Sequence, residues 1–175
     1  MKILSISFLV LWASVLSAQS LTLAKNGSTS YCIAYASNEE KSLQVTARLL
    51  QRFLNQSTQA QFGILEKIPS ENRNALILKS IPSDSTHPEG SFTINIQGKN
   101  VHFVGVGKGL EYSIYCFLEQ VLGCRYFAED ALVVPKKKVL RVPSNFHMSH
   151  EPPIAFRLNY NYEAFQEGYP QWHKL

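Results

Sequence analysis

One segment, a hairpin that leads through a glycine-rich turn into an amphipathic helix, constrains the fold of this chain most. Apolar and polar residues alternate over residues 92–104 on both sides of a polar turn, which is typical of two antiparallel strands. Gly107 and Gly109 then precede residues 110–122, whose apolar side chains recur at helical spacing. Gly123 follows where a left-handed helix cap is expected. We therefore expect this helix to pack on the strands that precede it.

A second helix is expected earlier in the chain, after the capping-box pattern of Ser37 and Glu40. It should run to about Asn55 and place an apolar stripe on a sheet, formed by Leu43, Ala47, Leu50 and Leu54. Further strands are expected at residues 21–24, 30–35, 62–65, 75–79, 131–134 and 139–142. The last two flank the lysine-rich residues 135–138, which are predicted to form a solvated turn. This order of elements predicts an α+β domain, with a mixed β-sheet and helices packed on it.

The N-terminal residues have the pattern of a secretory signal peptide. Lys2 precedes a mostly apolar run from Ile3 to Leu16, which small residues follow. We therefore expect residues 1–20 to direct export to the periplasm or the extracellular space, with cleavage after Ala18 or Ser20 and no membrane association afterwards. An uncleaved anchor is the alternative, although the run is short for a bilayer span.

Composition excludes several classes of protein. With 17 Lys and Arg against 13 Asp and Glu, the net charge of +4 is too small to favour nucleic-acid binding. A hydrophobic fraction of 45% suits one folded domain. Cys32, Cys116 and Cys124 cannot all pair within one chain, and their apolar and aromatic neighbours indicate buried free thiols.

The motifs that could carry chemistry are weak, so no cofactor, metal or catalytic residue is predicted. Residues 105–109 are similar to a phosphate-binding loop but lack its spacing, so a tight turn is favoured. His147, His150 and Glu151 make a poor metal cluster, and the alternation of its strand makes His102 a packed or surface side chain. Carboxylates that glycosidic cleavage would need are present but cannot be paired from sequence, namely Glu129, Asp130, Glu163 and Glu167.

Residues 104–127, with their spaced glycines and the Leu-Gly-Cys-Arg-aromatic sequence at their end, carry a family resemblance. They resemble the signature of the N-terminal domain of alpha-glucuronidases and family 20 beta-hexosaminidases. They are most similar to bacterial secreted relatives that join this domain to a barrel of unknown function. The resemblance extends over residues 21–143 and implies a zincin-like fold without the His-Glu-x-x-His metal motif, like the second domain of hexosaminidases.

The same resemblance implies how the chain is organised and what it does. In these enzymes the domain is accessory, and the catalytic carboxylates lie in the barrel that follows it. A barrel needs about 250 residues, so residues 144–175 are expected to be a linker and the start of a barrel that this truncated chain lacks. The chain alone is then expected to be non-catalytic, within a secreted glycoside hydrolase that contacts its glycan through the barrel.

Two residues are matched to sugar-binding positions by this resemblance. Residues 151–157 are similar to the join between the domains, where an arginine of hexosaminidases binds sugar hydroxyls, and Arg157 occupies that position. Tyr162 stands where alpha-glucuronidases have a tryptophan that lines the sugar site. A purely structural role, in which Arg157 caps the barrel end and Tyr162 packs, is the alternative for both.

A stand-alone module that binds carbohydrate or another protein is the rival hypothesis. The C-terminal segment is rich in aromatic residues that could stack on sugars if exposed, namely Tyr160, Tyr162, Phe165, Tyr169 and Trp172. The identity and linkage of the glycan do not follow from the sequence under either hypothesis.

The expected processing can be tested by intact mass and N-terminal sequencing after expression in an exporting bacterial host. We expect a mature chain that begins at Gln19 or Leu21, because signal peptidases cut after small residues that follow an apolar run. Leu9→Arg, which places a charge in that run, should abolish cleavage. A secreted product that retains Met1 would contradict the prediction.

Overall fold

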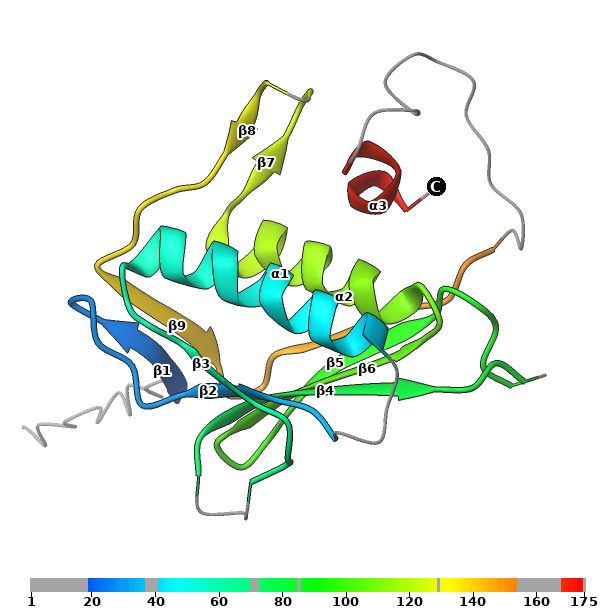
Figure 1. Cartoon of the computed structure of the whole chain (residues 1–175), viewed down its shortest axis with the longest axis horizontal. Helices are drawn as coiled ribbons and strands as arrows, with labels where there is room; N and C mark the ends of the chain where they lie inside the picture. The colour runs from blue at the N-terminus through cyan, green and yellow to red at the C-terminus, as the bar shows by residue number, and fades with distance from the viewer. Residues whose placement is uncertain are drawn as a thin grey trace, which may run out of the picture.

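The computed structural model describes residues 19–36, 41–69, 73–84, 86–128, 130–153 and 168–174. A six-stranded mixed sheet with the strand order β10-β5-β6-β4-β2-β3 forms one layer (Figure 1). Its strands are β2 (Cys32–Ala34), β3 (Gly63–Leu65), β4 (Ala75–Ile81), β5 (Phe92–Gln97), β6 (Asn100–Val106) and β10 (His147–His150). Pairs β2–β3, β2–β4 and β4–β6 are parallel, whereas β5–β6 and β10–β5 are antiparallel. The predicted α+β fold class and the hairpin at residues 92–104 are confirmed.

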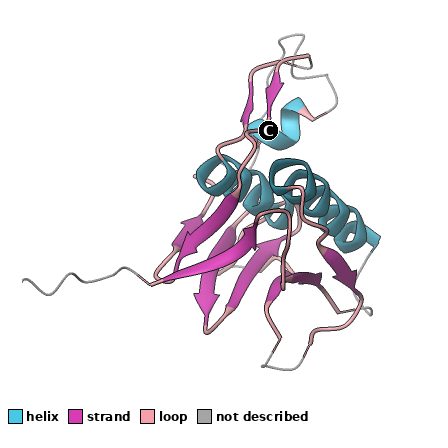
Figure 2. Cartoon of the chain, turned by 90° about the vertical axis from the view of Figure 1, so that its left-hand side faces the viewer, coloured by secondary structure: helices cyan, strands magenta, loops and turns pink. Residues whose placement is uncertain are grey.

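Two helices cover one face of this sheet (Figure 2). Helix α1 (Lys41–Thr58) extends three residues beyond the expected end, and in its last turn the Thr58 hydroxyl donates a hydrogen bond to the carbonyl of Leu54 at 2.7 Å. Residues 37–40, the expected capping box, lie outside the described residues. No helix in the described part of the chain combines the length and apolar character that a membrane span requires.

The second helix changes its winding near its end. Helix α2 (Gly109–Phe117) is followed by a π-helical turn, η1 (Leu118–Leu122), within the range expected to be one α-helix. Gly123 adopts the predicted left-handed cap with φ 77°. The backbone N–H of Cys124 then reaches the carbonyl of Leu118 at 3.0 Å.

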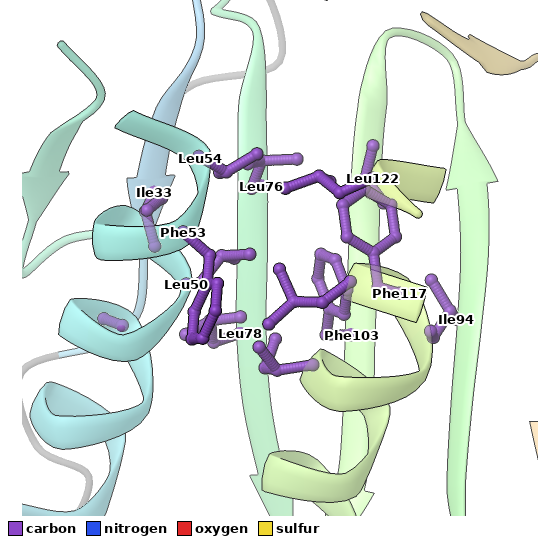
Figure 3. Close-up of a cluster of buried hydrophobic side chains, with 14 of the residues drawn as sticks. Ile33, Leu50, Phe53, Leu54, Leu76, Leu78, Ile94, Phe103, Phe117 and Leu122 are labelled. Atoms are coloured by element: carbon purple, nitrogen blue, oxygen red, sulfur yellow. The ribbon is translucent and has the colours of Figure 1, made fainter. Parts of the chain in front are cut away.

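The core lies between the helices and the central strands (Figure 3). Leu50 and Phe53 of α1 and Phe117 of α2 meet Leu78 of β4 and Phe103 of β6, and all five are almost fully buried. Phe103 and Phe117 contact edge to face, with ring centroids 5.1 Å apart. Each fully buried side chain of this size contributes roughly 1.5–3 kcal/mol, so this layer carries the stability of the domain.

Two strand pairings differ from the expectation. Strand β1 (Ser20–Lys25) pairs with β9 (Val139–Pro143) as a separate two-stranded sheet, whereas β8 (Leu132–Val133) pairs with β7 (Arg125–Tyr126). The apolar residues of β1 and β9 are buried in the main core, which favours this non-local pairing over a hairpin between residues 131–134 and 139–142.

The lysine-rich residues 135–138 are therefore more than a solvated turn, because they cap the C-terminal end of α1. Lys136 Nζ donates a hydrogen bond to the carbonyl of Gln56 at 2.6 Å, and the backbone N–H of Lys137 donates to that of Ser57 at 2.8 Å. A cation is favourable at this end of a helix. The expected interpretation of a purely solvated turn was wrong in this respect.

The C-terminal elements extend beyond the strands of the expected domain. Strand β10 lies within residues 144–175, the segment expected to begin as a linker, and pairs with β5 at the edge of the sheet. A short helix, α3 (Tyr169–His173), follows residues 154–167, which lie outside the described residues. Helix α3 and the β7–β8 hairpin stand on the side of the helices that faces away from the sheet (Figures 1 and 2).

All three cysteines are free thiols, as the sequence indicated. Cys32 and Cys124 are buried and Cys116 is partly buried. Burial raises the pKa of Cys124 to about 11, which disfavours the reactive thiolate at neutral pH.

Close approach of the backbone explains two glycines at the start of α2. A Cβ atom added to Gly105 would overlap the backbone of Leu110, and one added to Gly109 would overlap the carbonyl oxygen of Ser91. The strand, the turn and the helix can pack this tightly only because both positions lack a side chain.

We expect Gly109→Ala to lower the free energy of unfolding by about 1–3 kcal/mol, since a methyl group there forces the backbone apart. Gly63→Ala is the matched control, because nothing lies within 4 Å of a Cβ added at Gly63, and its effect should stay within about 0.5 kcal/mol. Urea unfolding followed by circular dichroism measures both. Equal effects of the two substitutions would disprove the close-approach argument.

Candidate binding groove on the helical face

The glycine-rich turn before α2 is occupied by a carboxylate of the chain itself. Glu89 Oε1 accepts a hydrogen bond from the backbone N–H of Lys108 at 2.8 Å. Gly107 has φ 51°, and a Cβ atom there would overlap the Glu89 carboxylate. The helix end that would hold a phosphate in a nucleotide-binding loop is thus satisfied internally, in agreement with the interpretation as a structural turn.

The histidine pattern at the other edge of the sheet does not converge on one point. His147 and His150 are three residues apart on β10, so their side chains project from opposite faces. The His150 ring packs against Phe92 at 5.5 Å, and no group of three metal-ligating side chains occurs among the described residues. Burial lowers the pKa of His102, which fits its expected role as a packed side chain.

A groove of about 890 Å³ lies on the outer side of the helical layer. It is bounded by α1, α2, the β7–β8 hairpin and α3 (Figure 1). Its volume is in the range of small-molecule sites. Apolar and aromatic side chains form much of its wall, namely Val45, Leu49, Phe53, Tyr115, Tyr126, Leu132 and Trp172.

Two arginines give the groove its positive side. Arg48 and Arg52 are exposed and lie one helical turn apart on α1. The Arg52 guanidinium lies 5.0 Å from the centroid of the Phe53 ring, in a cation–π contact. Among the described residues neither arginine forms a salt bridge. Both guanidinium groups thus line the groove with positive charge.

One acidic side chain, Glu111 of α2, lines the same groove. Burial raises the pKa of the Glu111 carboxyl, and the hydroxyl of Tyr115, which is hydrogen-bonded to it, partly offsets the shift. Burial, followed by the charge of Glu111, raises the pKa of Tyr115. The Tyr115 hydroxyl is thus held neutral and acts as a donor to the carboxylate.

Helix α3 closes one end of the groove through Trp172. Only 3% of Trp172 is exposed, so it is not one of the exposed aromatic residues that the rival hypothesis needs for stacking on sugars. The rings of Phe53 in α1, Tyr115 in α2 and Tyr126 in β7 cover it instead. Tyr169 is partly exposed and its ring contacts Tyr126 and His173, whereas Tyr160 and Phe165 lie outside the described residues.

The residues matched to sugar binding lie outside the described part of the chain. This holds for Arg157 and Tyr162, and for the carboxylates Glu129, Glu163 and Glu167. Asp130 is described and is exposed. The groove residues Arg48, Arg52 and Glu111 were not singled out from the sequence, because two arginines on the polar face of a helix resemble any solvated face until the opposite wall is in place.

Comparison with known proteins supports the fold at the level of structure. No family model matches the chain, and no curated sequence matches it. Among solved structures, it is similar to a family GH115 4-O-methyl-alpha-glucuronidase with specificity for decorated arabinogalactans. That alignment has 16% identity and a TM-score of 0.54, and covers 78% of this chain and 19% of the other.

Two further structures align less well. A GH20 exo-beta-N-acetylglucosaminidase from Vibrio harveyi has 12% identity and a TM-score of 0.49, over 78% of this chain and 17% of that enzyme. A GH138 enzyme that targets pectin rhamnogalacturonan II has 15% identity and a TM-score of 0.43, over 51% and 10%. The chain spans a fifth or less of the length of each of the three enzymes; with the glucuronidase, it shares the fold of a glycoside-hydrolase domain.

The environment of Glu111 predicts a pH-dependent stability. A carboxyl whose pKa is raised above the ordinary 4.5 in the folded state stabilises the fold when protonated, and this contribution is lost as the pH rises through the folded pKa. Glu111→Gln should therefore raise the melting temperature at about pH 7.5 and bring little gain near about pH 4.

The control for this comparison is Glu151→Gln, which replaces an exposed side chain and should change the melting temperature little at either pH. Differential scanning fluorimetry over the pH range measures both variants. A lower melting temperature for Glu111→Gln at neutral pH would show that the charged carboxylate stabilises the groove.

Proposed function

We propose that this chain carries the accessory, non-catalytic N-terminal domain of an exported glycoside-hydrolase-like protein that acts on a polysaccharide or another glycan. The observation that carries this proposal is the fold shared with the family GH115 alpha-glucuronidase over 78% of the chain. Residues 104–127, which carry the family resemblance, support it. They run from the end of β6 through α2 and η1 to β7, and their apolar side chains belong to the core.

The accessory role assigns the chemistry to another part of the protein. The catalytic carboxylates would lie in a barrel that follows this domain, as the family resemblance implies. Arg157 and Tyr162 are proposed to contribute to the sugar site of that barrel, Arg157 through its planar set of donors and Tyr162 through its ring. The signal-like residues 1–20 support export, so the glycan would be met outside the cytoplasm.

The second candidate function is a binding module for carbohydrate or protein. The groove favours it, because Arg48 and Arg52 face an open volume of about 890 Å³ beside aromatic side chains. Under this hypothesis the chain would bind a ligand by itself, whereas the accessory role does not require it to do so.

Two assays on the purified full chain test the proposal. We expect no hydrolysis of 4-nitrophenyl beta-N-acetylglucosaminide or 4-nitrophenyl alpha-glucuronide above the buffer blank, and no binding on a glycan array. Hydrolysis that disappears when one carboxylate is replaced would overturn the non-catalytic role.

Array binding would instead favour the binding module. In that case Arg48→Ala combined with Arg52→Ala should abolish binding, whereas Arg141→Ala, an exposed arginine on β9 away from the groove, should leave it intact. Binding that survives the double substitution would place the ligand elsewhere.

A further inference from the structure

Helix α3 is attached to the domain differently from every strand of the sheets. Among the described residues it shares no backbone hydrogen bond with another element, since its one additional backbone bond, from Trp172 to Gly168, is internal. A helix of five residues is too short to be stable alone. Side-chain contacts must therefore hold it in place.

Tyr169 and His173 each contact the Tyr126 ring, with centroids 6.2 Å apart, and Trp172 makes the larger set of contacts. The Trp172 indole is stacked on Tyr126 at 5.7 Å, and it contacts Tyr115 at 4.7 Å and the edge of Phe53 at 5.7 Å. These three rings belong to β7, α2 and α1, so the slot is built entirely by the preceding domain. A large aromatic side chain that fills a slot of this kind is typical of an interface hot spot.

The slot also satisfies the polar end of the indole. Nε1–H of Trp172 donates a hydrogen bond to Glu119 Oε1 at 2.7 Å. Glu119 belongs to the π-helical turn η1, where the α-helical winding is interrupted. Such turns are frequent at functional sites. The slot therefore combines a shape and a hydrogen-bond acceptor that suit tryptophan.

We propose that α3 is a latch, in which Trp172 docks the downstream polypeptide onto the helical face of the domain. The α+β domain forms the slot without α3, and docking orders the five residues of the helix. Its biological meaning rests on the proposed accessory function, because the latch would then fix the orientation of the segment that leads into the next domain.

The surface around the latch suits a larger protein contact. Next to the slot, two apolar side chains that line the groove are exposed, Val45 of α1 at 67% and Leu132 of β8 at 38%. They continue the surface on which α3 lies, and Arg48 and Arg52 flank it. The docking surface thus extends beyond α3 toward a partner surface with apolar and acidic side chains in the same polypeptide.

Fluorescence and hydrogen exchange on the full chain test the latch. The chain has two tryptophans, so Trp12→Phe leaves the Trp172 indole as the only one. In that parent we expect emission typical of a buried indole. Glu119→Ala should shift the emission to the red and speed the exchange of the α3 amides by about tenfold, because a hydrogen bond to a charged group is lost. Gln120→Ala, an exposed neighbour, should change neither.

Trp172→Ala separates a latch from an integral part of the core. We expect the amides of β4, β5 and β6 to exchange within a factor of about two of the parent, as for uncoupled sites, while the α3 amides lose protection. Equal loss of protection in the sheet, an emission typical of free indole in the parent, or no effect of Glu119→Ala would each overturn the latch. None of these readouts depends on glycan binding or hydrolysis, so the latch and the accessory function can fail separately.

Discussion

The packing of α1 and α2 on the central strands β4 and β6 is the interaction on which the rest of the structure depends. Leu50 and Phe53 on one helix and Phe117 on the other meet Leu78 and Phe103 in a layer that excludes water. The parallel strands β2, β4 and β6 need such a cover, because strands of this kind are stable only when their faces are shielded. The outer side of the same two helices then becomes the floor of the groove.

The turn between β6 and α2 connects this core to the groove. Gly105 and Gly109 let the helix approach the strand closely, and the Glu89 carboxylate satisfies the backbone N–H of Lys108 at the start of the helix. At the other end of the helical unit, the π-helical turn orients Glu119 toward Trp172. One continuous segment thus supplies a strand of the sheet (β6), a core helix (α2) and the hydrogen-bond acceptor of the latch (Glu119).

Local sequence patterns were sufficient to predict those parts of the fold whose contacts are between residues close in the chain. The hairpin of β5 and β6, the burial of Phe103 and the left-handed cap at Gly123 follow from alternation, helical spacing and the conformational freedom of glycine. The pairing of β1 with β9 did not follow, because more than a hundred residues separate the two strands and nothing in either segment specifies its partner. The groove could not be predicted from the sequence for the same reason, because its walls come from four elements that are distant in the chain.

The sequence by itself determined the α+β class, most of the helices and strands, and the internal role of the glycine-rich turn, because period, alternation and glycine spacing encode local backbone geometry. Only the tertiary structure decided that Trp172 is buried, that Lys136 caps α1, and that Arg48, Arg52 and Glu111 line one groove. Each of these depends on which distant surface a side chain meets. That choice is made by the burial of apolar area over the whole domain, which no local pattern records.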